Sequence, residues 1–464
     1  MGSIPAAADD DFSRNNNIDV IVIGAGYAGL SCAIELKRKG CNVHVVEREP
    51  KLQILGDIIT LTANASIVME KWGDVVEQMA AESARPAIVT FKSDKGEVLL
   101  EQDWKDKYNG HYNLYTSRAR SQNLIYDYAV KIGVKFTFGT RITDFWEGDD
   151  KAGVYLNGEL VTADFVVGAD GVYSRARKYV TGNTQMAQRS GFAVYRAYFP
   201  REHLQKDPLT HDLAYTENDQ LIIWIGLNLH AIIIVNARLG YISAYLTHKD
   251  TYTVEESWTY PGTVKDMLEV VEGCDPVLEA AIKQIPEHVI CDFKLLWRDP
   301  IDKWVSDKGR IVLVGDAAHP HLPTSGSGGG MGVEDGATLA SLVDRAGRSD
   351  IPSALRAFQK LRYDRTSTTQ RMGWEVRHKW HQTDWDRVKK EPQFLKIPQP
   401  DWLYSGDAER YGYEMFDAVM AHVKQGKPFR NTNVPDDYEP DDWNIKTMTE
   451  LDGKTGTDDL YKIA

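Results

Sequence analysis

A glycine-rich turn between an apolar strand and a helix most constrains what this chain can fold into. Residues 20–23 (VIVI) are followed by Gly24, Gly26 and Gly29, with Tyr27 and Ala28 among them, and then by an amphipathic segment. In such a unit the first glycine permits a tight turn, the second lets a pyrophosphate approach the backbone, and the third lets helix and strand pack closely. The phosphates would lie at the positive N-terminal end of a helix over about residues 28–39. The pattern predicts an α/β fold with a Rossmann-like dinucleotide-binding domain.

A carboxylate closes the second expected strand. Residues 43–46 (VHVV) end in Glu47 and Arg48, at about the 20-residue interval from the glycine turn where a carboxylate binds ribose hydroxyls. Glycine turns of this kind also occur as purely structural strand–helix connections, but the flanking patterns favour dinucleotide binding. This motif alone does not distinguish NAD from FAD.

Two further motifs follow, each at the end of an apolar run. Asp170 and Gly171 come after residues 165–167 (FVV), and Gly315 and Asp316 come after residues 311–314 (IVLV). The loop after the second of these contains Pro323 and the run Gly328-Gly329-Gly330-Met331. Residues without side chains let a backbone approach a flat ring, and we expect a helix to begin near Met331.

The order of the three motifs resembles the FAD-dependent aromatic hydroxylases, the single-component class A flavin monooxygenases typified by p-hydroxybenzoate and salicylate hydroxylases. The resemblance spans roughly residues 18–375 and implies FAD as the cofactor. It implies that Asp316 binds the ribityl chain and that Asp170 and Gly171 serve both FAD and the nicotinamide donor. Arg175 and Arg177, which follow, offer positive charge for phosphates or are merely solvated. The helix near Met331 would stabilise reduced flavin through its dipole.

Two more segments fall where relatives contact the flavin. Arg118 occupies the position of a flavin-contacting arginine, although Arg120 competes with it for that role. Gly56 and Asp57 lie where the chain passes the flavin edge, and they resemble fungal secondary-metabolite enzymes that act on indole alkaloids. The expected cofactor-binding residues are Gly24, Gly26, Tyr27, Ala28, Gly29, Glu47, Arg48, Gly56, Asp57, Arg118, Asp170, Gly171, Asp316, Pro323, Gly328, Gly329, Gly330 and Met331.

The chain divides into a discontinuous FAD-binding domain and inserts of strand-like composition. We expect the FAD-binding domain at 18–84, 112–186 and 290–375, and a mixed β-sheet substrate-binding domain at 85–111 and 187–289. Residues 376–464 would form C-terminal helices and an acidic tail. The sequence contains one GxGxxG run, so we expect no second Rossmann domain for a tightly held nicotinamide.

The larger insert holds the candidates for the substrate pocket. In related fungal enzymes an arginine in the context of Arg196 faces the flavin peroxide, so the resemblance implies a catalytic Arg196 that stabilises the leaving oxygen; a structural ion pair is the alternative. Tyr195, Trp224 and Tyr241 are aromatic pocket candidates, each of which could equally belong to the sheet core. His321, beside the expected flavin loop, is a further pocket candidate.

Net charge, cysteine spacing and hydrophobicity limit the binding partners and the cellular location that we expect. A formal net charge of −13 disfavours nucleic acid, which needs a basic surface. The four cysteines show no metal-ligand spacing, which favours a reduced environment without a metal site. No apolar run approaches the roughly 20 residues of a membrane span. We therefore expect a cytoplasmic monomer or homodimer without stable membrane insertion.

The predicted reaction uses NAD(P)H and O2 to hydroxylate or epoxidise a small, electron-rich aromatic substrate, by way of a flavin C4a-hydroperoxide. Our first substrate hypothesis is 2,3-epoxidation of an indole alkaloid, leading to a spiro-oxindole. A phenol or phenolic acid is the second. A flavin oxidase or a non-catalytic FAD-binding protein is the alternative from another class.

Overall fold

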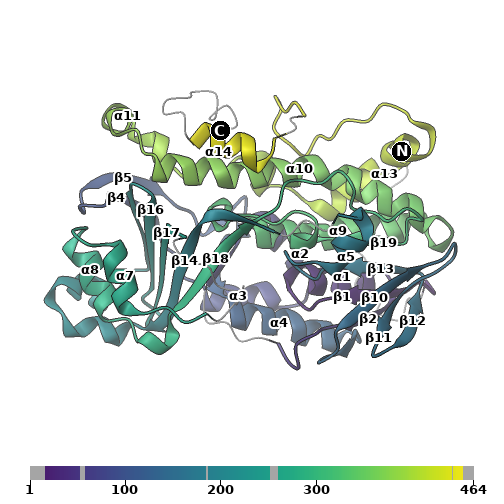
Figure 1. Cartoon of the computed structure of the whole chain (residues 1–464), viewed down its shortest axis with the longest axis horizontal. Coiled ribbons are helices and arrows are strands. Elements are labelled where there is room, and N and C mark those ends of the chain that lie inside the picture. Colours follow the sequence, from purple (N-terminus) through teal and green to yellow (C-terminus); the bar gives the residue numbers. More distant parts are fainter. Residues whose placement is uncertain (1–15, 53–57, 184–186, 251–259, 441–442, 453–464) are drawn as a thin grey trace.

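The computed structural model describes residues 16–52, 58–183, 187–250, 260–440 and 443–452. A parallel sheet with its helices forms one part of the molecule and a larger sheet forms the other (Figure 1). The long helix α10 (Ile351–His381) runs along both parts. The α/β fold with FAD-type and mixed-sheet parts is thus confirmed.

The first sheet is parallel throughout and has the order β19-β13-β1-β2-β9. Its central strands β1, β13 and β19 read as nearly continuous apolar runs because helices and the three-stranded sheet β10-β11-β12 (residues 142–163) bury them. All three sequence motifs follow neighbouring strands at their carboxyl ends, which is where ligands bind in open α/β sheets. The strands are β1 (Asp19–Ile23), β2 (Asn42–Val46), β9 (Lys135–Thr137), β13 (Phe165–Gly168) and β19 (Ile311–Leu313).

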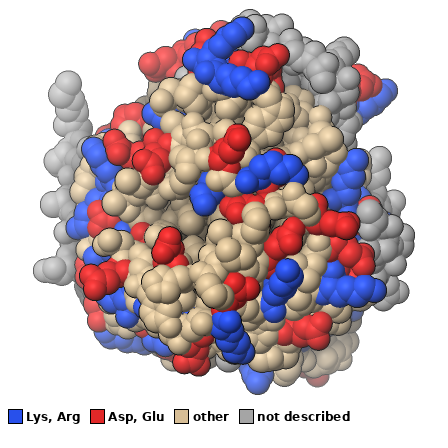
Figure 2. Space-filling model, turned by 90° about the vertical axis from the view of Figure 1, so that its left-hand side faces the viewer, with Lys and Arg blue, Asp and Glu red and all other residues tan. Residues whose placement is uncertain are grey.

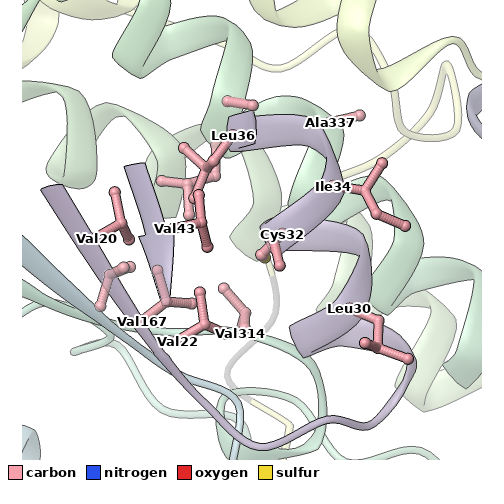
Figure 3. Packing of buried hydrophobic residues seen from close by; sticks show 14 of the residues in the cluster. Val20, Val22, Leu30, Cys32, Ile34, Leu36, Val43, Val167, Val314 and Ala337 are labelled. Carbon is pink, nitrogen blue, oxygen red and sulfur yellow. The ribbon is translucent and has the colours of Figure 1, made fainter. Parts of the chain in front are cut away.

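Helix α1 (Tyr27–Arg38) packs its apolar side on this sheet and against α9 (Gly328–Ala346). Figure 3 shows Val22 and Val43 on the strand side of this core and Cys32 and Leu36 on the helix side. All four side chains are at most 4% exposed. The dense packing fixes the position of the glycine turn between β1 and α1.

The second sheet has seven strands in the order β18-β14-β17-β16-β15-β4-β5. The pair β4–β15 is parallel and the other pairs are antiparallel. Strand β18, the last of the seven along the chain, lies beyond the boundary that we expected at residue 289 and runs to Trp297. It belongs to this sheet because it pairs with β14. The strands are β4 (Ile88–Ser93), β5 (Val98–Asp103), β14 (Gln188–Pro200), β15 (Gln220–Gly226), β16 (Leu229–Asn236), β17 (Tyr241–Lys249) and β18 (Cys291–Trp297).

The two faces of this sheet have different neighbours. One face is covered by α7 (Val264–Val270) and α8 (Pro276–Lys283) over an apolar cluster. The other face meets α10 and the loops of the first part. Figure 2, which looks at this end of the molecule, shows acidic and basic side chains interspersed over its surface.

The remaining elements connect and cover the two parts. Helix α10 is continuous through residue 376, where we expected the C-terminal region to begin. No helix in the described ranges combines the length and apolar character that a membrane span requires. The other elements are β3 (Ile58–Leu61), β6 (Lys107–Tyr108), β7 (His111–Tyr112), β8 (Leu114–Ser117), β10 (Ile142–Glu147), β11 (Ala152–Leu156), β12 (Glu159–Ala163), α2 (Ala63–Met69), α3 (Val75–Glu82), α4 (Arg118–Lys131), α5 (Arg175–Thr181), α6 (His211–Tyr215), α11 (Trp385–Lys390), α12 (Asp401–Tyr404), α13 (Ala408–Gln425) and α14 (Ile445–Asp452).

Candidate functional site

The three glycines of the first motif occupy different environments. Gly24 has φ +100°, and a Cβ there would lie 2.5 Å from the carbonyl oxygen of Ala169; a Cβ on Gly29 would lie 2.0 Å from the carbonyl oxygen of Gly24. Gly26 is exposed, and a Cβ there would meet nothing within 4 Å. Gly24 and Gly29 therefore build the turn, whereas Gly26 leaves backbone open at the N-terminus of α1, as a pyrophosphate requires.

Glu47 joins the end of β2 to this turn. Its carboxylate accepts hydrogen bonds from the backbone N–H of Ala25 at 2.8 Å and of Glu49 at 2.9 Å. A carboxylate has about four lone-pair sites, so capacity remains for ribose hydroxyls. Arg48 instead points to solvent and pairs with Glu49 at 3.2 Å.

Asp316 lies beside the first motif. A Cβ on Gly315, at φ +55°, would lie 2.5 Å from the Cβ of Ala28, so this turn sits directly against the start of α1. The Asp316 side chain is accessible to solvent, yet the surrounding protein desolvates it enough to raise its pKa, while His319 and Arg118 act to lower it. An accessible carboxylate in such enclosed surroundings suits a polyhydroxylated ligand that donates hydrogen bonds.

Arg118 and Arg120, the two candidates for the flavin-contacting arginine, lie in different surroundings. Arg118 lies over the ring of Tyr27 at 6.0 Å, and the Tyr27 hydroxyl donates to the Arg118 carbonyl at 2.9 Å. The charge of Arg118 also acts on Asp316. Arg120 pairs with Glu82 at the exposed surface. Arg118 is therefore the arginine that the fold brings to the glycine and aspartate motifs.

Asp170 is occupied in building the second motif. It accepts hydrogen bonds from the Ser174 hydroxyl and from the backbone N–H of Arg175 at 2.7 Å. The second bond satisfies a backbone N–H at the start of α5. Gly171, at φ +76°, makes the turn between them. Arg177 is buried and donates to the carbonyls of residues 317 and 318 at 3.3 and 3.0 Å, and burial lowers its pKa to about 9. Arg177 thus tethers α5 to the third motif, contrary to the expectation that it presents charge to phosphates.

A buried ionic network underlies the third motif. Asp335 accepts hydrogen bonds from the Gly315 backbone at 2.8 Å, from His319 at 2.6 Å and from Arg362 at 2.8 Å. Burial alone would raise the pKa of Asp335, but His319 and Arg362 outweigh it and lower that pKa to about 2. The sequence analysis missed this network. Its signal was the acidic pair at residues 334 and 335 inside an otherwise apolar helix.

The loop after the third motif, residues 320–327, is bound to α10, and we call it the flavin loop. Gln370 donates to the Pro320 carbonyl at 2.9 Å, and Thr324 donates to the Gly373 carbonyl at 2.7 Å. The ring of His321 contacts Thr369 at 2.9 Å, and burial, together with His319, lowers the pKa of His321 to about 3. His321 is therefore neutral at physiological pH.

Helix α9 begins at Gly328, three residues before the expected Met331. A Cβ added to Gly328 would lie 3.0 Å from the Cβ of His321, and one added to Gly329 would lie 2.9 Å from the Cδ1 of Ile59. Gly330 and Met331 are buried, the latter in a separate apolar cluster, while Pro323 is exposed. The loop therefore offers Pro323 and the backbone of the first helical turn, not the Met331 side chain.

Arg196 faces the first part of the molecule. In the β14–β17 ladder it lies opposite Tyr245, and opposite residues of an antiparallel pair project from the same face. The Tyr245 hydroxyl exchanges hydrogen bonds with the N–H and the carbonyl of Ile58 at 2.8 and 2.9 Å. Ile58 directly follows Gly56 and Asp57, which lie outside the described residues. Arg196 itself is 8% exposed.

Two of the three aromatic pocket candidates, Tyr195 and Trp224, do not share that face. Tyr195 and Trp224 pack in the apolar cluster beneath α7 and α8, on the opposite side of the sheet from Arg196. The Trp224 indole donates to Asp275 at 2.8 Å. Tyr241 is on the Arg196 face but at its end, 36% exposed and stacked on Tyr198 with ring centroids 4.9 Å apart. This placement speaks against substrate contact by Tyr195 and Trp224.

An aromatic cluster that the sequence analysis did not identify covers the Arg196 face instead. We call it the tryptophan cluster. Arg196 adjoins it, since the Arg196 guanidinium lies 4.8 Å from the centroid of the Phe293 ring, which packs against the cluster. Arg377 adjoins it from α10, with its guanidinium 4.5 Å from the Trp374 ring centroid. Its members are Phe192, Val194, Leu295, Trp297, Leu322, Trp374, Trp443 and Met448.

The residues present fit FAD. The open Gly26 suits the pyrophosphate, Glu47 the ribose, and the accessible Asp316 the ribityl hydroxyls, and all three lie at the carboxyl ends of strands of the same parallel sheet.

Comparison with known proteins agrees with this geometry. Residues 17–355 match the family model described as an FAD binding domain. The FAD-dependent monooxygenase nanF of Aspergillus nanangensis is 32% identical over 91% of this chain and 94% of its own. The asperlicin C monooxygenase of Petromyces alliaceus is 31% identical over 91% and 94% of the two chains.

Solved structures show the same similarity. The crystal structure of CtdE in complex with FAD and a substrate superposes with a TM-score of 0.83 and 29% identity, over 88% of this chain and all of that one. A salicylate hydroxylase–substrate complex shares the fold, with a TM-score of 0.70 and 20% identity over 88% and 98% of the two chains. The chain therefore belongs to the FAD-dependent monooxygenases, with FAD as its cofactor.

Proposed function

We propose that this monooxygenase transfers one oxygen atom to an electron-rich aromatic ring, with Arg196 as the catalytic residue and NAD(P)H as the reductant. The first substrate hypothesis remains an indole epoxidised at its 2,3-bond, on the way to a spiro-oxindole. The relatives, fungal FAD-dependent monooxygenases, support a substrate from fungal secondary metabolism. The single observation that carries the proposal is the orientation of Arg196 toward the part of the molecule that holds the FAD motifs.

The chain's residues would divide the work as follows. When bound, FAD would accept the electrons of NAD(P)H and activate oxygen. Gly26, Glu47 and Asp316 would hold the FAD. The planar guanidinium of Arg196 would donate parallel hydrogen bonds to the reacting oxygen as charge develops on it. Because Arg196 is buried, water screens this interaction little.

The tryptophan cluster would hold the aromatic substrate and exclude water. Indole and phenyl rings provide flat apolar surface for a flat ligand, and a water-poor site prevents wasteful breakdown of activated oxygen. His321 remains a pocket candidate, and its lowered pKa means that it would face a substrate as an uncharged ring.

A substrate screen tests this function. Purified enzyme would be incubated with FAD, NAD(P)H, O2 and either an indole or a phenol. The mass of each product would be determined by mass spectrometry. We expect indoles to gain one oxygen atom. A gain confined to phenols would replace the indole hypothesis with the phenol one, and flavin reduction without an oxygenated product from either series would contradict the proposal.

A substitution tests the role of Arg196. Arg196→Lys removes the planar pair of donors, so we expect flavin reduction to persist while oxygenated product falls about 10²–10³-fold and hydrogen peroxide appears in its place. Arg238→Lys is the matched control, since Arg238 lies just beyond β16, where it donates to the Ser83 carbonyl at 3.2 Å. A variant at residue 196 that couples NAD(P)H to product as tightly as the control would refute the assignment.

A further inference from the structure

Two buried indole N–H groups lie next to each other in the tryptophan cluster without an acceptor. Trp297 and Trp374 are both 0% exposed, and their ring centroids are 5.2 Å apart at an interplanar angle of 84°. Within the described ranges neither Nε1 has a hydrogen-bond partner. An indole nitrogen can only donate, and a buried donor left unsatisfied is destabilising.

Most other buried tryptophans of this chain avoid that cost. Trp443, in the same cluster, donates to the Ser367 hydroxyl at 2.9 Å. Trp104, in the apolar cluster around β4 and β5, is the other buried tryptophan without an acceptor among the described residues. The following buried tryptophans donate to carboxylate or carbonyl oxygens: Trp72, Trp224, Trp304 and Trp380. Two orphaned donors in one contact are therefore exceptional in this fold.

The geometry of the pair leaves at least one donor to be satisfied. In an edge-to-face arrangement only one ring directs its edge at the face of the other, so within the pair at most one N–H can make the weak contact with the π face of its neighbour. The Arg377 guanidinium also lies over the Trp374 ring at 4.5 Å. A ligand that accepts hydrogen bonds would remove the remaining cost.

The pair is also in the right place for a substrate. Trp374 follows Gly373, whose carbonyl accepts from Thr324 in the flavin loop. The cluster includes Leu322 of that loop and Val194, which is two residues from Arg196 and so projects from the same face of β14. The cluster that contains the two donors thus joins the flavin loop to the face of β14 that carries Arg196.

We infer that Trp297 and Trp374 form a carbonyl-binding subsite, so that the substrate is an aromatic molecule carrying a ketone, amide or lactam oxygen beside the ring to be oxygenated. This inference rests on the proposed function. A bare indole offers only a donor N–H and would leave both tryptophans unsatisfied. A carbonyl oxygen has two lone pairs and could accept from one or both.

A matched pair of neutral probes tests the subsite. 2,3,4,9-Tetrahydrocarbazol-1-one and 2,3,4,9-tetrahydro-1H-carbazole are the same indole with and without one carbonyl oxygen. Their dissociation constants would be measured on the FAD-loaded enzyme by the change in flavin absorbance, with no turnover. We expect the ketone to bind roughly 2- to 13-fold more tightly, which is the effect of one hydrogen bond.

Phenylalanine variants identify the donors. Trp374→Phe and Trp297→Phe keep an aromatic ring but remove the N–H, so one or both should lose the preference for the ketone. The space left by the smaller ring affects both probes and cancels in the ratio. Trp443→Phe is the control within the same cluster and should keep the preference.

The outcomes separate the subsite from the reaction. Equal affinity of the parent enzyme for the two probes, binding of neither, or an unchanged preference in both variants would overturn the inference. Product mass from the same two probes reports on the proposed function independently. Flavin reduction without oxygen transfer to either probe would count against that function while leaving a measured ketone preference in place.

Discussion

Gly26 and Gly29 stand three residues apart in one motif, yet substituting alanine at each should damage different properties. A Cβ on Gly29 would lie 2.0 Å from the backbone oxygen of Gly24, far inside the 3.4–4 Å of ordinary contact. A Cβ on Gly26 would meet nothing within 4 Å. Gly29→Ala should therefore destabilise the protein, whereas Gly26→Ala should chiefly weaken FAD binding.

The magnitudes follow from these environments. Because the atom that clashes at Gly29 is backbone, the strain should be near the upper end of the about 1–3 kcal/mol typical of overpacking. Alanine is favoured over glycine inside a helix by about 1 kcal/mol, which leaves a net loss of about 2 kcal/mol. Gly26 is the N-cap of α1, with φ −75° and ψ 179°, an ordinary conformation for alanine. Its substitution should cost at most about 1 kcal/mol, but the methyl group would stand where a pyrophosphate approaches.

Two measurements on each variant distinguish the cases. Thermal unfolding of flavin-free protein reports stability, and titration with FAD reports affinity. We expect Gly29→Ala to lower the unfolding temperature clearly, and Gly26→Ala to leave it nearly unchanged while FAD affinity falls at least about 10-fold, or about 1.4 kcal/mol. Normal FAD affinity in Gly26→Ala, or equal instability of the two variants, would refute the division of roles.

Three other predictions follow from the same site. FAD should be released by heat in a 1:1 ratio to protein, and flavin that remains attached after denaturation would contradict non-covalent binding. Asp316→Ala should reduce FAD affinity about 10- to 150-fold for each charge-assisted bond lost, at about 1.5–3 kcal/mol per bond, with an unchanged circular dichroism spectrum; equal affinity would refute its role. Because the pKa of Asp335 is lowered to about 2 from 3.8, its ionised form contributes about 2 kcal/mol of stability above pH 4 that is lost as the pH falls toward 2. Asp335→Asn should flatten this acid limb of the stability curve, and an unchanged limb would show that other carboxylates control it.

The parts of the site that could be predicted are those encoded by short stretches of chain. Gly24, Gly171 and Gly315 each come within three residues of the end of an apolar strand, and each has a positive φ. The need for glycine in these turns can therefore be recognised from a short stretch of sequence. The parallel sheet then brings these strand ends together without further information from the sequence. The same reasoning located Glu47 and Asp316 beside the glycine turn.

Side-chain direction within the insert was less well predicted, for a reason visible in the sequence. Tyr195 and Arg196 are adjacent in one strand, so they project from opposite faces, and at most one of them can face the flavin. In the structure Arg196 projects from the face that carries Tyr245, and Tyr195 packs beneath the helices on the other side.

The tryptophan cluster was beyond sequence reasoning because its members come from distant segments. Phe192 and Trp297 lie on two strands, Leu322 in the flavin loop, Trp374 on α10 and Trp443 near the C-terminus. No spacing or motif links them, and only the path of α10 over both parts of the molecule brings them together.

That path also explains why a buried ionic network and the apolar tryptophan cluster both pack against the same helix. One part of α10 supplies Arg362, which is 1% exposed and donates to Asp335 beneath the aspartate motif. A later part supplies Trp374 and Arg377 to the tryptophan cluster. Since breaking a buried pair is strongly destabilising, by about 3–5 kcal/mol, the ionic contacts hold the helix in one register along the flavin loop. A shift of that register would move Trp374 relative to the loop, so the ionic network under the aspartate motif also positions the tryptophan cluster.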